Sequence, residues 1–293
     1  MKPTLSRMLF LLGLLLIAWL SLSDGREGRA AIMQHDERLT PIQREIQRQQ
    51  QRLSSEDAEE RRDALMHLGN LRRPEASRAA TSSLRDRSDT VRVAAAHALG
   101  SLPSAEAAPL LMPLLKEKSE FVRREAAFAL GETRNRSAAA PLAEMLRDKK
   151  ASVRAAAAIA LGKIGDETSV PALAQILTAG SDGKKSKSTD EEFVRRSAAQ
   201  SLGHIRSRAA VPVLIETLEN LSAASDTRRE AATSLGLIGD TSALPALRAA
   251  LESNDPYLAE AARLAMRAIE RNKKNKGAGI SSNAFVFLLA VAA

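Results

Sequence analysis

The sequence predicts an all-α protein: a right-handed solenoid of about six helix pairs followed by a terminal half-repeat. Apolar residues make up 44% of the 293 residues and aromatic residues only 3%, so a core must consist of Ala, Leu, Ile and Val. Alanine-rich faces favour helix formation and let helices approach closely. One short segment also recurs along the chain at a nearly constant spacing, which is typical of stacked arrays rather than of one compact core.

The recurring segment has the pattern Val-Arg-x-x-Ala-Ala-x-Ala-Leu-Gly. Its closing residue, called the anchor glycine below, is found at Gly69, Gly100, Gly131, Gly162, Gly203 and Gly236. The first three intervals between anchor glycines are equal, the fourth is longer by ten positions, and the fifth is longer by two. A nearly fixed period of this size indicates one supersecondary unit per repeat, stacked on its neighbours.

Each unit is predicted to contain two helices. The first begins near a proline that lies nine or ten residues after an anchor glycine; these prolines are Pro109, Pro141, Pro171, Pro212 and Pro245. The fixed φ and the missing N–H of proline suit a first helical turn. The second helix is the recurring segment itself, and its glycine falls near the C-terminal end, where a left-handed cap or close packing favours a residue without Cβ.

This pattern resembles the HEAT-like repeats first noted in phycobilisome lyases, which are compact relatives of HEAT and armadillo repeats. The resemblance covers residues 56–272, with a shorter period than that of typical HEAT repeats. It implies that the second helices line the concave side of a curved stack. Residues 255–271 are expected to form one last helix. A Gln/Arg-rich helix at residues 41–53 is expected to cap the other end, because an uncapped terminal repeat exposes its core.

Residues 1–23 have the features of a signal peptide or an N-terminal membrane anchor. Lys2 and Arg7 precede an almost wholly apolar run at residues 8–20, and small residues follow it. The run is shorter than the roughly 20 residues of a spanning helix, which favours cleavage over anchoring. The rest of the chain is therefore predicted to be exported, either to the periplasm or to the outer face of the cytoplasmic membrane.

The remaining chain divides into three segments. They are a linker and capping helix (24–55), the solenoid (56–272) and a basic, then apolar, tail (273–293). The Gly/Ser/Lys-rich residues 178–190 lengthen the fourth anchor spacing; they are expected to form a loop that is either a plain linker or part of a binding surface. The apolar run at 284–293 is too short to span a bilayer as a helix.

Six arginines recur eight residues before the anchor glycines: Arg61, Arg92, Arg123, Arg154, Arg195 and Arg228. They form either an anion-binding ladder or a structural one. The resemblance to HEAT repeats, in which this arginine pairs with a nearby aspartate, favours the structural ladder. Asp89, Glu120 and Glu192 lie three residues before three of these arginines, a spacing that allows pairing on one helix face.

Residues that vary within the constant pattern are better candidates for binding. Three residues before the anchor glycines the sequence has Met66, His97, Phe128, Ile159, Gln200 and Thr233. Four residues earlier on the same helix face it has Arg62, Val93, Arg124, Ala155, Arg196 and Arg229. The predicted partner-binding set comprises Met66, His97, Phe128, Ile159, Gln200, Arg124, Arg196 and Arg229. The resemblance implies that they line the concave side, and exposed Arg and apolar residues are typical of interfaces. The alternative is that Phe128 and Ile159 are buried against the next repeat.

The sequence offers little for catalysis. It has no cysteine, which excludes disulfides, thiolate nucleophiles and Cys-ligated zinc. His67, His97 and His204 hold different positions relative to the anchor glycines, and the His-Glu pairs with which the iron-binding HEAT-repeat hydroxylases ligate metal do not occur. Walker and dinucleotide-binding motifs are also missing. We therefore expect no catalytic residue, no metal and no cofactor.

These observations favour a non-catalytic scaffold that binds a partner protein through its concave face. The resemblance to lyases implies an alternative, an accessory or lyase-like subunit that handles a chromophore. Nucleic-acid binding is a third function to consider, since the net charge is +8. The signal-like segment and the single Tyr and single Trp argue against it, because single-stranded nucleic acid is commonly bound on aromatic side chains. Membrane association through either terminus stays open.

Overall fold

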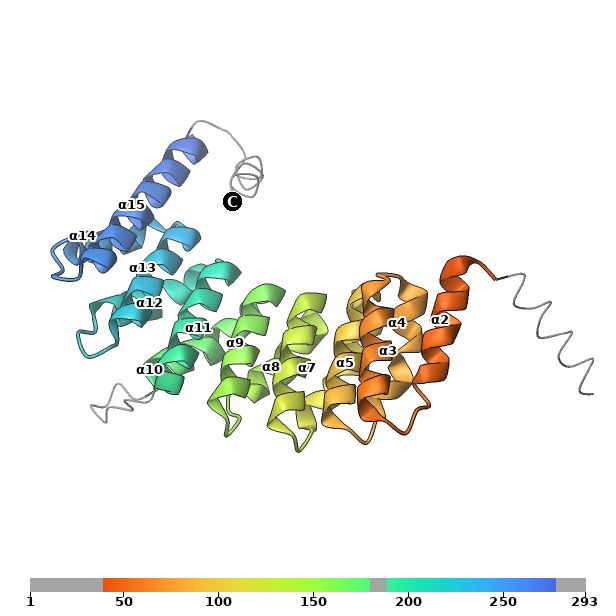
Figure 1. Ribbon diagram of the computed structural model, residues 1–293. Coiled ribbons are helices and arrows are strands. Elements are labelled where there is room, and N and C mark those ends of the chain that lie inside the picture. Colours follow the sequence, from red (N-terminus) through yellow and green to blue (C-terminus); the bar gives the residue numbers. More distant parts are fainter. Residues whose placement is uncertain (1–38, 180–188, 278–293) are drawn as a thin grey trace, which may run out of the picture.

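The structure is a computed structural model that describes residues 39–179 and 189–277. In these residues the regular elements are all helices, which follow one another in sequence order along a curved stack from α2 to α15 (Figure 1). The predicted all-α solenoid is therefore confirmed. The signal-like segment, most of the insertion and the apolar run of the tail lie outside the described residues. No helix within the described ranges is long and apolar enough to cross a bilayer.

The described helices form seven pairs. The first helices are α2 (Pro41–Arg52), α4 (Pro74–Ala79), α6 (Ser104–Leu111), α8 (Ala139–Met145), α10 (Val170–Thr178), α12 (Val211–Glu219) and α14 (Leu244–Ala250). The second helices are α3 (Ala58–Asn70), α5 (Asp89–Ala98), α7 (Glu120–Thr133), α9 (Ala151–Ile164), α11 (Thr189–Ile205), α13 (Ser225–Ile238) and α15 (Pro256–Gly277). The expected capping helix is α2, which packs on α3, and the expected last helix is α15, which packs on α14. Each therefore completes a pair.

The prolines of the first helices lie at two kinds of position, in the first turn or in the helix interior. Pro171, Pro212 and Pro245 lie in the first turns of α10, α12 and α14, as predicted. The same prediction is wrong for Pro109, which lies inside α6 because that helix already begins at Ser104. Proline cannot donate a backbone hydrogen bond, and α6 passes into a short 3-10 helix at Met112–Lys116 soon after it.

The anchor glycines let neighbouring second helices touch. A Cβ built on Gly131 would lie 2.8 Å from the Cα of Ala160, and a Cβ on Gly203 would lie 2.9 Å from the Cα of Ser234. Real Cβ atoms do not approach a backbone so closely, so only glycine fits. Left-handed conformations are found instead three residues after the anchor glycines, at Arg72, Arg134, Gly165, Arg206 and Gly239. Of the two predicted roles, Gly131, Gly162, Gly203 and Gly236 fulfil close packing, whereas a Cβ on Gly100 would meet nothing within 4 Å.

The second helices form the inner layer of the stack. They pack directly on one another, whereas neighbouring first helices have fewer mutual contacts. When two layers contain equal numbers of helices, the stack curves toward the layer whose helices lie closer together. The leucine before each anchor glycine is fully buried between the layers: Leu68, Leu99, Leu130, Leu161, Leu202 and Leu235. We call the exposed side of the second helices, opposite the first helices, the inner face.

Candidate functional site: the arginine ladder and the inner face

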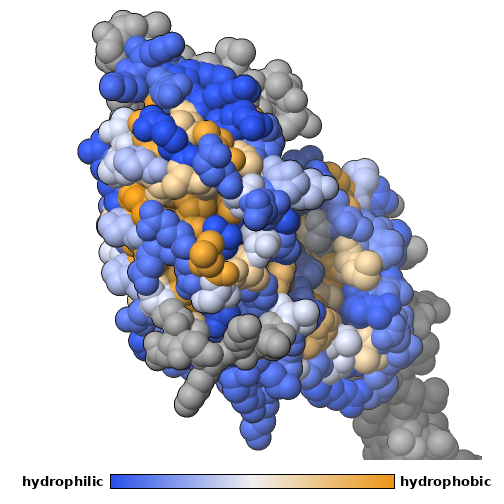
Figure 2. All heavy atoms as spheres, turned by 90° about the vertical axis from the view of Figure 1, so that its left-hand side faces the viewer, coloured by the Kyte–Doolittle hydropathy of each residue, from blue (hydrophilic) through white to orange (hydrophobic). Residues whose placement is uncertain are grey.

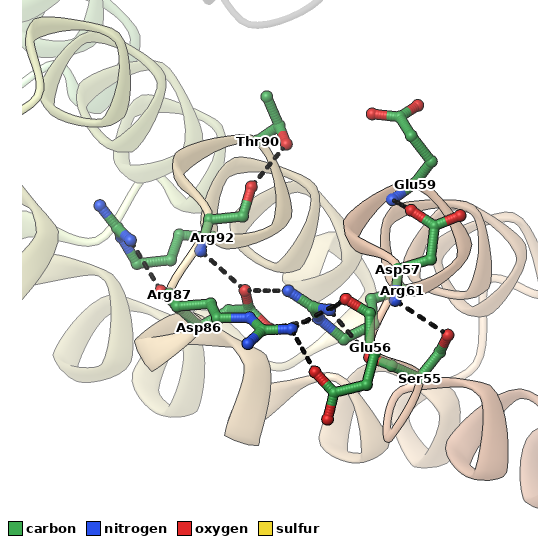
Figure 3. Close-up of polar contacts among 10 residues, drawn as sticks. Ser55, Glu56, Asp57, Glu59, Arg61, Asp86, Arg87, Thr90 and Arg92 are labelled. Atoms are coloured by element: carbon green, nitrogen blue, oxygen red, sulfur yellow. Dashed lines mark hydrogen bonds and ion pairs between the residues drawn. The ribbon is translucent and has the colours of Figure 1, made fainter.

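The recurring arginines donate hydrogen bonds to the chain segments that join the two helices of a pair. Arg61 is only 4% exposed and donates both Nε and Nη2 to the carboxylate of Asp86, each at 2.8 Å (Figure 3). Its Nη1 donates to the carbonyls of Ser55 and Glu56, between α2 and α3. Arg92, on the next second helix, donates to the carbonyl of Asp86 at 2.7 Å. The loop at Asp86 is thus held by arginines from two consecutive repeats.

Arg123, which lies two repeats after Arg61, makes the same kinds of contact. It donates to Asp148 at 2.8 and 3.0 Å and to the carbonyls of Glu117 and Lys118 at 2.8 and 2.9 Å. The other members also reach carbonyls at or beyond the end of a first helix: Arg154 to Asp148, Arg195 to Ala179 and Arg228 to Leu218. Helix C-termini leave carbonyls without intrahelical donors, and the arginines satisfy them.

The acidic partners differ from those expected on the same helix. Arg92 does pair with Asp89, at 2.5 Å. The expected Arg123–Glu120 pair is wrong, because Glu120 accepts from Ser152 and pairs with Lys150. Glu192 likewise accepts from Thr227 instead of pairing with Arg195.

The actual partners lie in the next repeat, at one constant separation along the chain. They form the pairs Arg61–Asp86, Arg92–Glu117 and Arg123–Asp148. Sequence reasoning missed these acids, although they recur at the same period as the anchor glycines. The constant separation ends at the insertion. Arg154 pairs with Glu191, and within the described residues neither Arg195 nor Arg228 pairs with an acid.

These contacts shift the ionisation of the buried aspartates. The hydrogen bond from Arg61 holds the pKa of Asp86 below its ordinary value, against the effect of burial. Burial alone would raise the pKa of Asp148, but the hydrogen bonds from Arg123 and from the Lys150 amide outweigh it and lower the pKa. Both aspartates are therefore held in the charged form, which is the form that pairs with arginine.

The predicted partner-binding residues, which we call the binding column, lie on the inner face. Met66, His97, Gln200 and Thr233 are exposed, and Met66 is 55% accessible. Phe128 and Ile159 are partly buried, between the two alternatives that the sequence left open. Val93 and Ala155, from the earlier position on the helix, are buried. The column is thus a surface with a half-buried apolar middle.

Three aromatic side chains cover the arginines of this column. The guanidinium of Arg124 lies 5.2 Å from the ring centroid of Phe121, and that of Arg196 lies 5.4 Å from Phe193. Arg229 lies 5.0 Å from the ring of Tyr257 on α15. The rings are 38%, 45% and 71% exposed, respectively. Sequence reasoning missed them, although Phe121 and Phe193 precede their arginines by three residues and so share a helix face with them. We call these contacts the aromatic–arginine clusters.

The arginines of the inner face are also paired with acids. Arg124 contacts Glu125 at 2.8 Å, and Arg196 lies 3.7 Å from Asp226. Arg229 pairs with Asp226 at 2.8 Å and with Asp255 at 2.9 Å. The inner face is therefore a surface of mixed charge.

Two further carboxylates lie close to the column. Burial raises the pKa of Glu230 on α13, and the nearby charge of Arg196 opposes this only in part. Glu125 contacts the Nε2 of His97 on the preceding second helix at 3.2 Å. In residues 39–179 and 189–277 no three acidic or histidine side chains are grouped as metal ligands.

Comparison with known proteins places the chain in a family. No curated protein sequence is significantly similar to it. Among solved structures, YibA of Escherichia coli is 18% identical over 80% of this chain and 90% of that one, with a TM-score of 0.54. The complex of CpcE and CpcF of phycocyanin lyase from a Nostoc species is 24% identical over 80% and 95%, with a TM-score of 0.47. Human deoxyhypusine hydroxylase is 22% identical over 78% and 96%, with a TM-score of 0.35.

At such identities a structural likeness shows the fold alone. The sequence itself is more specific, because the profile of HEAT repeats matches three overlapping stretches, residues 47–127, 112–190 and 185–267. Together these stretches span most of the chain and contain all six anchor glycines. The chain therefore belongs to the HEAT-repeat family.

Proposed function

We propose that this chain is an exported, non-catalytic scaffold that binds a partner protein through its inner face. The observation that carries the proposal is the set of three exposed aromatic–arginine clusters. Aromatic and arginine side chains dominate the binding energy of protein interfaces, and they do so where they lie close together. The rings come from α7, α11 and α15, which are alternate second helices.

The spacing of the clusters suits a macromolecular partner. Packed helices lie about 8–10 Å apart, so rings on alternate helices lie about 16–20 Å apart and the three together extend over about 35 Å. A small molecule does not reach across that length. The acids beside Arg124, Arg196 and Arg229 reduce the attraction for a phosphate backbone, which favours a protein over a nucleic acid.

We expect the double variant Phe121→Ser, Phe193→Ser to bind the partner at least tenfold more weakly, because loss of an interface hot spot lowers binding by about 2 kcal/mol or more. The partner would be identified by crosslinking the full chain in its native host, and the affinity would then be measured with both proteins purified. The matched control is Leu221→Ser, which removes an apolar side chain that is 84% exposed in the loop between α12 and α13. Equal affinities of the double variant and the wild type would refute the assignment of the inner face.

Export is tested separately. The sequence of residues 1–23 supports cleavage after the small residues that follow the apolar run. We expect N-terminal sequencing of the mature protein from an envelope fraction to start close to residue 24. Recovery of an intact Met1 in a soluble cytosolic fraction would contradict export, and it would leave the proposal for the inner face untouched.

A further inference from the structure

Glu230 on α13 is an inner-face acid that has no donor. Its side chain is partly buried, and among the described residues it accepts no hydrogen bond and forms no ion pair. Arg196 supplies a nearby positive charge, but its guanidinium lies over the ring of Phe193 and is paired with Asp226. A partly buried carboxylate without a donor opposes folding. The stability of the stack therefore does not account for this residue.

The equivalent carboxylate on α7 is satisfied. Glu125, like Glu230, lies six residues before its anchor glycine. It contacts Arg124 of its own helix at 2.8 Å and the Nε2 of His97 on the preceding second helix at 3.2 Å. A carboxylate at this position of the repeat can thus find its partners within the stack.

Neither of these partners is available to Glu230. The position of the histidine on the preceding second helix holds Gln200, which donates no hydrogen bond to Glu230. The arginine that precedes the carboxylate is Arg229, and it pairs with Asp226 and Asp255 instead. Glu230 therefore keeps its capacity to accept from a donor that belongs to another molecule.

Exposed apolar side chains share this part of the inner face with Glu230. They are Phe193 on α11, Leu237 on α13, and Tyr257 and Leu264 on α15. Helix α13 packs between α11 and α15. Leu237 follows Glu230 by seven residues, and Leu264 follows Tyr257 by seven, which places each pair on one helix face. Figure 2 views the molecule from the α15 end and shows a band of apolar side chains bordered by hydrophilic ones.

An acceptor among apolar side chains selects the chemistry of what binds to it. A carboxylate only accepts hydrogen bonds, and its strongest donors are the guanidinium of arginine and the ammonium of lysine. Apolar contacts around a central polar pair exclude water and so strengthen it. An acidic segment would place a like charge against Glu230, and a wholly apolar segment would bury the carboxylate without a donor. The partner segment is therefore basic and apolar.

We propose that Glu230 binds a basic side chain of the partner protein, an arginine or lysine flanked by apolar residues, which contact Phe193, Leu237, Tyr257 and Leu264. The inference rests on the proposed function, because it uses the inner face, and it adds the chemistry of the partner segment. In this arrangement the partner provides Glu230 with the kind of donor that Glu125 has within the stack.

Selection of peptides tests this chemistry before the partner is known. A phage library of random short peptides is selected on the immobilised full chain, and the enriched peptides are synthesised and measured by fluorescence anisotropy. We expect them to carry Arg or Lys next to apolar residues. Glu230→Gln should weaken their binding at least tenfold, because a charge pair across an interface is lost. Replacement of the basic residue of the peptide by Leu should weaken binding to the wild type equally, but should leave binding to Glu230→Gln unchanged.

Glu216→Gln is the matched control, since it removes an exposed carboxylate from α12 of the same repeat. It should leave peptide affinity within twofold of the wild type, and an equal loss in both variants would overturn the assignment to Glu230. Glu230→Gln should unfold at the same temperature as the wild type or a higher one, because it removes a partly buried charge. A lower unfolding temperature would assign Glu230 a structural role instead.

The selection can also contradict the inference directly. Enrichment of acidic peptides, of peptides without a basic residue, or of no peptide at all would overturn it. If Phe193→Ser weakens peptide binding and Glu230→Gln does not, the inference fails and the proposed function stands. If neither substitution weakens binding, the inner face is not the binding surface and both proposals fail.

Discussion

Replacement of Arg123 by alanine is expected to lower the free energy of unfolding by about 3–5 kcal/mol, the range for breaking a buried ion pair. The side chains of Arg123 and Asp148 are each only 9% exposed. The substitution leaves the carboxylate of Asp148 without its two arginine donors and the carbonyls of Glu117 and Lys118 without theirs. Equilibrium unfolding in urea, followed by circular dichroism, measures the change.

Arg78 provides the matched control for this prediction. It forms the same kind of two-point contact, with Glu106 at 2.9 and 3.0 Å, but the two side chains are 51% and 37% exposed. Exposed ion pairs contribute little because water and salt screen them. Arg78→Gln should therefore leave the unfolding midpoint unchanged. Similar losses in the two variants would show that burial does not decide the strength of the ladder.

The pH dependence of Arg123→Ala gives an independent readout. Because the folded-state pKa of Asp148 is lowered, its contribution to stability is fully present above the unfolded value of about 3.9 and is lost as the pH falls toward the folded value. Asp86 adds a contribution of the same sign. The wild type should thus lose stability below about pH 4, and the variant should lose less over the same interval. Parallel pH curves would contradict the role assigned to the Asp148 pair.

Gly203→Ala is expected to lower the free energy of unfolding by about 2 kcal/mol, although alanine favours a helix, because overpacking of a closed interface costs about 1–3 kcal/mol. The new Cβ would lie 2.7 Å from the Cβ of Ser234 and 2.9 Å from its Cα. Ser234 is fully buried, and its hydroxyl donates to the carbonyl of Ala199 at 2.8 Å. The serine has no free space to move into, so α11 and α13 must separate.

Gly100 is the anchor glycine that serves as control. A Cβ there meets nothing within 4 Å, and the backbone does not have a positive φ. Gly100→Ala should leave stability unchanged or raise it by up to about 1 kcal/mol, through the lower entropy of the unfolded chain. Thermal and urea unfolding of the two variants should therefore differ in sign. A comparable loss in both would mean that the anchor glycines are needed for backbone conformation and not for close packing.

The fold could be predicted because local patterns specify it. Gly162 and Pro171, for instance, lie near the end of one helix and in the first turn of the next, and both can be recognised without reference to the rest of the chain. Contacts between repeats were harder to predict. The acid that meets Arg123 is Asp148, which stacking brings there from the next repeat, whereas the sequence argument looked along one helix and chose Glu120.

The candidate site was predicted in outline only. The exposure of Met66 and His97 on the second helices could be predicted, since the variable positions of a repeat are those not needed for stacking. The half-burial of Phe128 depends on how deeply neighbouring helices pack, which spacing does not reveal. The acids that neutralise Arg229 come from two different repeats, at Asp226 and Asp255. Charge on this face is therefore a property of the assembled stack.

The ion pairs that join neighbouring repeats change their position along the stack. Up to α9, each repeat is joined to the next by an ion pair between a ladder arginine and an acid of the following repeat. From α11 onward, Arg195 and Arg228 hold carbonyls of their own pair. The inner-face arginines Arg196 and Arg229 instead reach acids of the following repeat, Asp226 and Asp255. A one-dimensional array is stabilised by such nearest-neighbour couplings. In the α2–α9 half the couplings use largely buried ion pairs, whereas in the α11–α15 half they use more exposed ones, which salt screens more strongly. Arg196 and Tyr257 lie in the α11–α15 half, so a partner that binds to the inner face there competes with ion pairs that join neighbouring repeats.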